Sequence, residues 1–243
     1  MRDYLLDVVQ HTFDLGCIDL IKITGTDAET SIDAIAEDRS VVVQAKFLNP
    51  VPEFIGVFGM PNLSKLKVLL NLQEYRENAH ITVNRQNRNG VDAPVGLHFE
   101  NAARDFKNDY RFMTSEIISE KLKTAKFRGA NWHVEFEPLV AGIQRLKMQA
   151  QANAEESTFQ TKTDGDTLKF IFGDHSTHAG EFVFHAGITG GLKRSWSWPV
   201  KQFISILDLT GDKVVRISDD GAAQITVNSG IAEYNYILPA QSK

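Results

Sequence analysis

The sequence predicts an α+β fold made of two similar halves, and three observations support this prediction. Only four segments have the spacing of amphipathic helices, whereas most others alternate apolar and polar residues or are rich in β-branched residues. The expected strands follow one another through short turns without helices between them, as antiparallel strands do. Each half also has the same order of elements: a helix, three or four strands, a helix and three strands.

The four helices are identified by their apolar spacing and by their boundary residues. The first begins at Asp3, which is expected to cap it, and ends near Leu15, just before Gly16. The second begins after Asn62, in a segment with leucines at helical spacing. The third and the fourth open at Pro138 and Pro199, because proline is favoured in the first turn of a helix.

Fifteen segments are predicted to be strands, separated by turn residues such as glycine, asparagine and aspartate. In the first half they cover 18–24, 30–36, 40–47, 54–58, 80–84, 96–101 and 110–115. In the second half they cover 132–136, 158–162, 167–172, 181–185, 195–198, 213–218, 223–228 and 233–238. From this order we expect a first domain over 1–116, a polar and basic connecting loop over 117–130, and a second domain over 131–243.

The composition is that of an ordinary globular protein, and it excludes several classes. Of the 243 residues, 42% are hydrophobic and 23% are charged, and the formal net charge is −5. No apolar run approaches the ~18 residues of a membrane span, and Asp3 and Asp7 stand where a signal peptide would be apolar. The single cysteine, Cys17, excludes an internal disulfide. We therefore expect a protein of the reducing cytoplasm.

The basic residues are concentrated in the helical regions, although the chain as a whole is acidic. The segments 63–73, 138–154 and 192–207 contain bases but neither Asp nor Glu. The acids gather instead in turns and at strand edges, for example at Asp27, Glu37 and Asp219. Basic helix faces can contact phosphates without distinguishing one base from another. This pattern favours a surface that binds a polyanion.

Four segments, by their order and spacing, resemble the DNA polymerase sliding clamps of the PCNA type. They are FIGVFGMPNLSKLKVLLNL at 54–72, the helical segment PLVAGIQRLKMQ after the connecting loop, SWSWPVKQFISIL at 195–207, and the ending AEYNYILPAQSK. The pattern spans nearly the whole chain. Within this family it is similar in particular to the processivity factors of T-even-like tailed bacteriophages.

The resemblance implies two DNA-clamp domains, each with antiparallel sheets outside and two short helices lining the inner face of a ring. Three copies of the chain would join head to tail through edge strands, and this homotrimer would enclose double-stranded DNA of any sequence. It would tether a replicative DNA polymerase and confer processivity in DNA replication, and an ATP-driven clamp loader would open it. The resemblance implies no enzymatic activity and no cofactor, and a place in the cytoplasm of the bacterial host.

The resemblance also assigns two sets of site residues. Those expected to face DNA lie on the helical segments or just before the fourth, and they are Lys65, Lys67, Arg145, Lys147, Lys193, Arg194 and Lys201. Those expected to form a pocket for a partner's peptide are Ile117, Ile118, Leu122 and Phe127 in the connecting loop and Ile237, Leu238 and Pro239 near the end. On the residues alone, these apolar side chains could equally hold the connecting loop against the domains.

Two other functions remain open on the sequence. Asp33, Asp38 and Lys46, on adjacent expected strands, are faintly similar to the core of a Mg²⁺-dependent restriction-type nuclease, but position 44 is Gln rather than an acid. A structural β-rich virion protein would also fit the pattern. No Ser-His-Asp or Cys-His arrangement and no tight metal-binding spacing stands out, so the sequence predicts no catalytic residue and no metal site.

Overall fold

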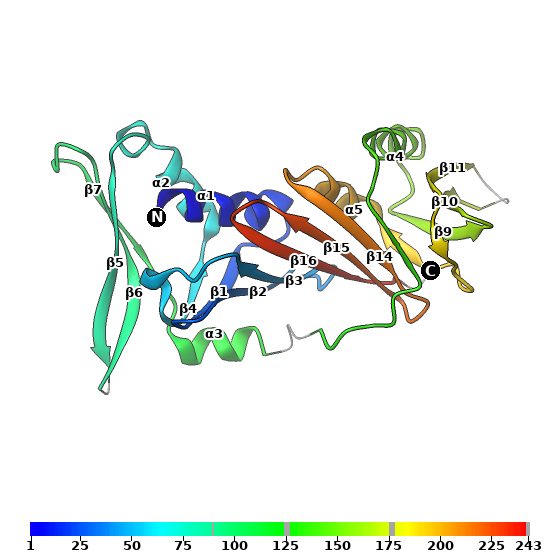
Figure 1. The fold of residues 1–243 in the computed structure, drawn as a ribbon. Helices are drawn as coiled ribbons and strands as arrows, with labels where there is room; N and C mark the ends of the chain where they lie inside the picture. Colours follow the sequence, from blue (N-terminus) through cyan, green and yellow to red (C-terminus); the bar gives the residue numbers. More distant parts are fainter. Residues whose placement is uncertain (89, 124–126, 175–177, 242–243) are drawn as a thin grey trace. The chain divides into compact units, whose positions relative to one another are not determined.

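The computed structural model describes residues 1–88, 90–123, 127–174 and 178–241, and the contacts of the chain divide it into two units (Figure 1). Unit 1 comprises Met1–Lys126 and Ser229–Tyr234, and unit 2 comprises Phe127–Asn228 and Asn235–Lys243. The strand β16 (Ala232–Pro239) therefore begins in unit 1 and ends in unit 2.

Unit 1 combines antiparallel sheets with short helices. The helices are α1 (Arg2–His11), α2 (Leu63–Asn71) and α3 (Ser115–Lys121), with 3₁₀ turns at Phe13–Leu15, Pro52–Phe54 and Gln73–Tyr75. The strands are β1 (Leu20–Gly25), β2 (Thr30–Ile35), β3 (Val42–Phe47), β4 (Gly56–Pro61), β5 (His80–Arg88), β6 (Val91–Glu100) and β7 (Lys107–Arg111). Neighbouring strands run in the orders β3-β2-β1-β4 and β5-β6-β7, and every one of these pairs is antiparallel.

The sheet β1–β4 buries one of its faces on the side where α1 and α2 lie (Figure 1). Ile21 and Ile23 of β1 are fully buried and alternate with half-exposed residues, as expected for a strand with one face in the core. The register places Ile21 opposite Ala34 of β2 and Ile23 opposite Phe58 of β4. The helix α2 completes this core with a stripe of four buried leucines, Leu63, Leu66, Leu69 and Leu70.

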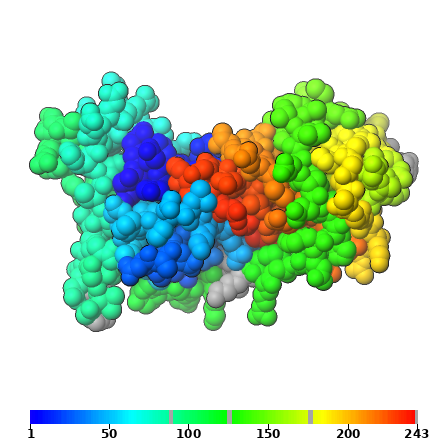
Figure 2. Space-filling model, in the orientation of Figure 1, coloured from blue at the N-terminus to red at the C-terminus, as the bar shows by residue number. Residues whose placement is uncertain are grey.

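The helix α3 lies against the opposite face of the same sheet (Figures 1 and 2). Ile118 and Leu122, one turn apart, are buried in a small separate cluster with Leu20, Ile35, Val57 and Met113. The prediction of a connecting loop over 117–130 is therefore wrong for the part of α3 that it includes, and residues 124–126 of that loop lie outside the described residues. The helix forms because its two apolar side chains cover a patch that would otherwise be exposed.

The segment Ser229–Tyr234 returns to unit 1 and completes its core. The N–H of Leu48 donates a hydrogen bond to the carbonyl of Ile231 at 2.9 Å. The hydroxyl of Tyr234 donates to Asp7 Oδ2 of α1 at 2.8 Å, and the Tyr234 ring stacks on His11 with 4.6 Å between centroids. Because Asp7 and His11 are buried, this network satisfies polar groups that water does not reach.

Unit 2 repeats the combination of antiparallel sheets with a pair of helices. The helices are α4 (Val140–Ala152) and α5 (Val200–Leu207). The strands before β16 are β8 (Val134–Phe136), β9 (Thr158–Asp164), β10 (Thr167–Gly173), β11 (Ala179–Ala186), β12 (Thr189–Gly190), β13 (Ser197–Pro199), β14 (Asp212–Ile217) and β15 (Ala222–Asn228). Their orders are β12-β8-β14-β15, followed by the second part of β16, and β11-β10-β9-β13.

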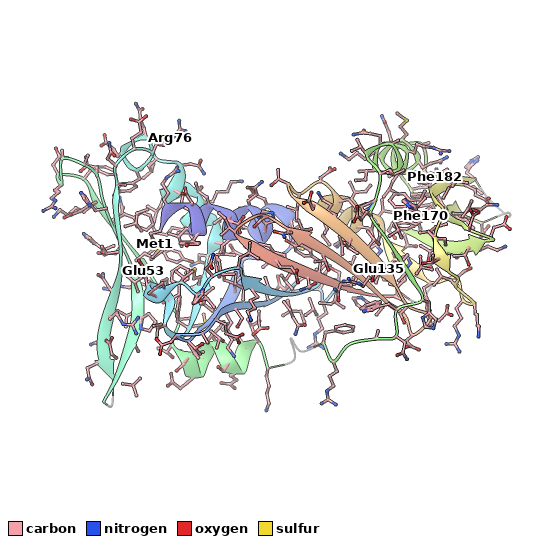
Figure 3. The ribbon with its side chains drawn as sticks, viewed as in Figure 1. Met1, Glu53, Arg76, Glu135, Phe170 and Phe182 are labelled. Carbon is pink, nitrogen blue, oxygen red and sulfur yellow. The ribbon has the colours of Figure 1, made fainter. Side chains whose placement is uncertain are left out.

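Aromatic rings fill the core of unit 2 between α4, α5 and the strands β9–β11. Phe170 stacks on Phe184 with 4.2 Å between centroids, and Phe203 of α5 meets the ring of Phe159 edge to face at 5.1 Å. Figure 3 shows Phe170 beside Phe182 of the neighbouring strand, with 5.9 Å between their centroids. These rings fix the height at which α4 and α5 sit above the strands.

The predicted elements agree with the observed ones in type and order. All four expected helices and all fifteen expected strand segments overlap an observed element of that type, with ends shifted by a few residues. The third helix begins at Val140 rather than at Pro138, and α1 begins at Arg2, so that Asp3 lies in its first turn instead of capping it. The elements that were not predicted are the short ones, α3 and the two-residue β12.

We predict that Gly59→Ala lowers the free energy of unfolding by about 1–3 kcal/mol, because the added methyl group crowds the contact between β4 and α3. A Cβ at position 59 would lie 2.8 Å from Cγ1 of Ile118. The backbone of Gly59 cannot easily move away, because its N–H and its carbonyl both form hydrogen bonds with the backbone of Met113. The matched control is Gly191→Ala, whose Cβ would meet only Thr163 Oγ1 at 3.4 Å. Urea unfolding of both variants checks this, and equal stabilities would contradict it.

Candidate nucleic-acid interface

The helix α2 presents Lys65 and Lys67 to solvent because its leucine stripe faces the core. Lys65 is exposed, and no ion pair of its Nζ is found among the described residues. Lys67 differs, because its Nζ lies 2.7 Å from Asp14 Oδ1 and 5.7 Å from the centroid of the Phe13 ring. The two predicted DNA-facing residues of unit 1 therefore have different electrostatic surroundings, and only Lys65 presents an uncompensated charge.

In unit 2, Arg145 projects from α4 over the edge of the strand β11. Gly142 and Leu146 are the buried positions of α4, which turns Arg145 outward. Its Nη1 donates a hydrogen bond to the carbonyl of Val183 at 3.1 Å, and its guanidinium lies 5.5 Å from the centroid of the Phe182 ring. Arg145 thus keeps its charge, but one of its five N–H donors is already bound within unit 2.

Lys147 and Lys201 lie on the two helices of unit 2. Lys147 Nζ lies 2.5 Å from Oδ1 of Asp208, the residue directly after α5. Burial lowers the pKa of Lys213, and the nearby carboxylates of Asp208 and Asp212 oppose this shift. Lys201 is exposed on α5, and its Nζ forms no ion pair within the described part of the chain.

Lys193 and Arg194 do not lie on a helix, in agreement with the expectation that they precede the fourth helix. They belong to the segment between β12 and β13, and α5 begins only at Val200. Asp219 fixes this segment, because its Oδ1 accepts the N–H of Lys193 at 2.9 Å and the N–H of Arg194 at 3.1 Å. The carbonyl of Asp219 also accepts the indole N–H of Trp196 at 2.9 Å. The two cationic side chains remain exposed.

The solvent-facing sides of the helices also carry large apolar side chains. Val68 of α2 is 60% exposed, and Val140 and Met148 of α4 are 74% and 66% exposed. They lie among the bases of the same helices, Val68 directly after Lys67 and Met148 directly after Lys147. The helix surfaces are therefore less basic than the sequence pattern alone indicates.

The residues predicted to form a peptide pocket divide by burial. Ile118 and Leu122 are covered by the sheet of unit 1, and Ile237 and Leu238 are buried in unit 2. Exposed or half-exposed surface remains on Ile117 in unit 1 and on Phe127 and Pro239 in unit 2, where the Phe127 ring lies 6.0 Å from that of Trp132.

The geometry does not support the nuclease alternative. The carboxylate of Asp38 accepts hydrogen bonds from the N–H and the hydroxyl of Ser40, which also lower its pKa. Lys46 Nζ binds Glu29 Oε2 at 2.7 Å instead of facing a carboxylate pair. Among the described residues, no group of three or more His, Cys, Asp or Glu is placed to hold a metal ion.

The helices of the described residues include none that is both long and apolar enough to span a membrane.

We predict that Asp219→Ala increases trypsin cleavage after Lys193 and Arg194 and lowers the free energy of unfolding by about 1–3 kcal/mol. The variant removes the acceptor of two backbone N–H groups that hold this segment, so local opening becomes easier. Asp220→Ala, at the next residue, is the control and leaves these two bonds intact. Unchanged cleavage at both sites would contradict the assigned role of Asp219.

Comparison with known proteins places this arrangement of sheets and helices among clamps. No model of a protein family and no curated protein matches the sequence. The PCNA of A. fulgidus, solved with the C-terminal region of FEN-1 bound, matches with a TM-score of 0.70 at 10% identity, over 100% of this chain and 96% of that one. The PCNA of Thermococcus kodakaraensis matches with a TM-score of 0.66 at 13% identity, over 99% and 97%. The chain therefore has the two-domain α+β fold of the PCNA clamps.

Proposed function

We propose that this protein is a sliding clamp that encircles duplex DNA and tethers a DNA polymerase, as a scaffold without catalytic activity. The observation that carries the proposal is the match of the fold to two PCNA clamps along the whole chain. The resemblance of four sequence segments to the clamps of T-even-like bacteriophages supports a role in phage DNA replication, in the cytoplasm of the host.

In the proposed ring, the helix pairs of both units face the duplex. Lys65 and Lys201 present charges without an ion-pair partner among the described residues, and Arg145, Lys193 and Arg194 add exposed cations. Such side chains attract phosphates through counterion release and make no distinction between base pairs. A closed ring needs no strong grip, because its topology prevents escape, and weak contacts allow it to slide.

The proposed homotrimer closes through edge strands, and β11 is the edge that unit 2 offers. The other ends of its sheets are β12, with two residues, and β13, which is bridged by Gln241. An edge strand exposes N–H and C=O groups that can pair with a strand of another copy. A head-to-tail ring of this kind would be opened by an ATP-driven loader.

For partner binding, we propose the apolar surface that remains exposed in unit 2 on Phe127 and Pro239. In unit 1, Ile117 presents apolar surface of its own. The A. fulgidus PCNA binds the C-terminal region of FEN-1, which makes a short peptide of a polymerase or another DNA enzyme the expected ligand here.

We predict that the protein has about three times the mass of one 27.2 kDa chain in solution, and that Val183→Pro disrupts this assembly. The Val183 carbonyl bonds to Arg145 of α4, and proline removes the N–H of this residue on the edge strand β11. Val183→Ala keeps the N–H and is the control. Light scattering at micromolar concentration measures the mass, and a strict monomer at all concentrations would contradict the ring.

We predict that the double reversal Lys65→Glu and Lys201→Glu weakens binding to a linear duplex at least tenfold and reduces processive synthesis. Both side chains are exposed, so the free energy of unfolding should change by less than about 1 kcal/mol. Lys123→Glu with Lys162→Glu changes the net charge equally at exposed positions off the helix pairs. Fluorescence anisotropy checks the result, and equal losses in both double variants would show that only net charge matters.

A further inference from the structure

Each unit contains one lysine of the helix surface that is neutralised by an aspartate from beyond the end of the neighbouring helix. In unit 1, Lys67 of α2 pairs with Asp14, which follows α1. In unit 2, Lys147 of α4 pairs with Asp208, which follows α5. The N–O distances are 2.7 and 2.5 Å. The same arrangement thus occurs twice, although the two halves share no sequence repeat.

Stability is a weak explanation for these two pairs. Their side chains are between 35% and 43% exposed, and ion pairs in that environment are screened by water and salt. A carboxylate at the C-terminal end of a helix also opposes the helix dipole, and Asp208 is the C-cap of α5. Both pairs are therefore too exposed to stabilise the fold strongly, and Asp208 also stands where its helix disfavours an acid.

The pairs do have a direct effect on how the helices meet an anion. A lysine held at 2.5 to 2.7 Å by a carboxylate brings no net charge to an approaching phosphate. The DNA phosphate has to displace the aspartate, and the displaced acid then lies close to the DNA and repels it. Each pair therefore removes one favourable interaction with a phosphate and adds one unfavourable charge.

We propose that Asp14 and Asp208 attenuate DNA binding, by holding Lys67 and Lys147 in ion pairs that duplex phosphates would otherwise take. The proposal rests on the proposed function and explains how the protein limits its grip to a strength that permits sliding. Exposed Val68, beside Lys67 on α2, and exposed Met148, beside Lys147 on α4, contribute to the same low charge density.

The test compares Asp14→Asn, Asp208→Asn and the double variant with the full-length protein. Binding to a fluorescent linear duplex is measured by anisotropy between about 50 and 200 mM salt. Each substitution frees one lysine, so log K should fall more steeply with log salt, by up to about 0.9 for each additional phosphate that the protein neutralises. Affinity at the lowest salt should rise at least threefold in each single variant.

Three controls separate release of these lysines from a change in net charge. Glu29→Gln makes the same charge change but frees Lys46 on β3, and it should leave the salt slope unchanged. Asp14→Glu keeps the charge and should keep the wild-type slope. Lys67→Ala in the Asp14→Asn background, and Lys147→Ala in the Asp208→Asn background, should return binding to the wild-type level.

The outcomes distinguish this proposal from the proposed function. If the two aspartate variants bind DNA like the wild type while Lys65→Glu with Lys201→Glu weakens binding, the proposal of attenuation is wrong. The proposal that the helices face DNA is then still supported. If none of these variants changes binding, both are wrong. If Glu29→Gln raises affinity and slope as much as Asp14→Asn does, net charge explains the effect and the attenuation is again wrong.

Discussion

The alternation of side chains along the strands determines which helix residues remain available for function. Each sheet that carries α1 and α2 or α4 and α5 turns an apolar face toward these helices, and the helices have to cover it. In α2, Leu66 and Leu70 meet this requirement, which leaves Lys65 and Val68 outside. The outward surface of a helix pair is therefore the part of the sequence that the core does not constrain, and its charge can change without altering the fold.

Periodicity was sufficient to predict most elements, but it missed the helix α3 and the two-residue strand β12. The four expected helices and most of the expected strands have enough residues to display a repeat of 3.6 or of 2. The helix α3 buries only Ile118 and Leu122, in a segment that is otherwise polar, so its apolar pattern is too brief to be recognised. Its existence depends on a patch of β1, β2 and β4, which is tertiary information.

The bases of the candidate site were visible in the sequence, but their surroundings were not. Asp14 lies 53 residues before Lys67 in the chain, and nothing local indicates that the two side chains meet. The carbonyl of Val183 beside Arg145 is likewise a product of how α4 sits on β11. Asp208, the C-cap of α5, was a visible signal, because the C-terminal end of a helix disfavours an acid. Its partner, Lys147, could be identified only from the fold.

The hydrogen bond between Tyr234 and Asp7 connects the middle of α1 to a residue more than 200 positions later in the chain. Unit 1 is therefore incomplete until residue 234 has been synthesised, even though most of it is translated first. When only the first 126 residues have emerged from the ribosome, the carboxylate of Asp7 in α1 still lacks the Tyr234 hydroxyl that donates to it. Unit 1 can therefore complete its folding only after most of unit 2 has been synthesised. A single cut between residues 126 and 127 would separate Ser229–Tyr234 from the rest of unit 1, so the fragments would not both contain a complete unit.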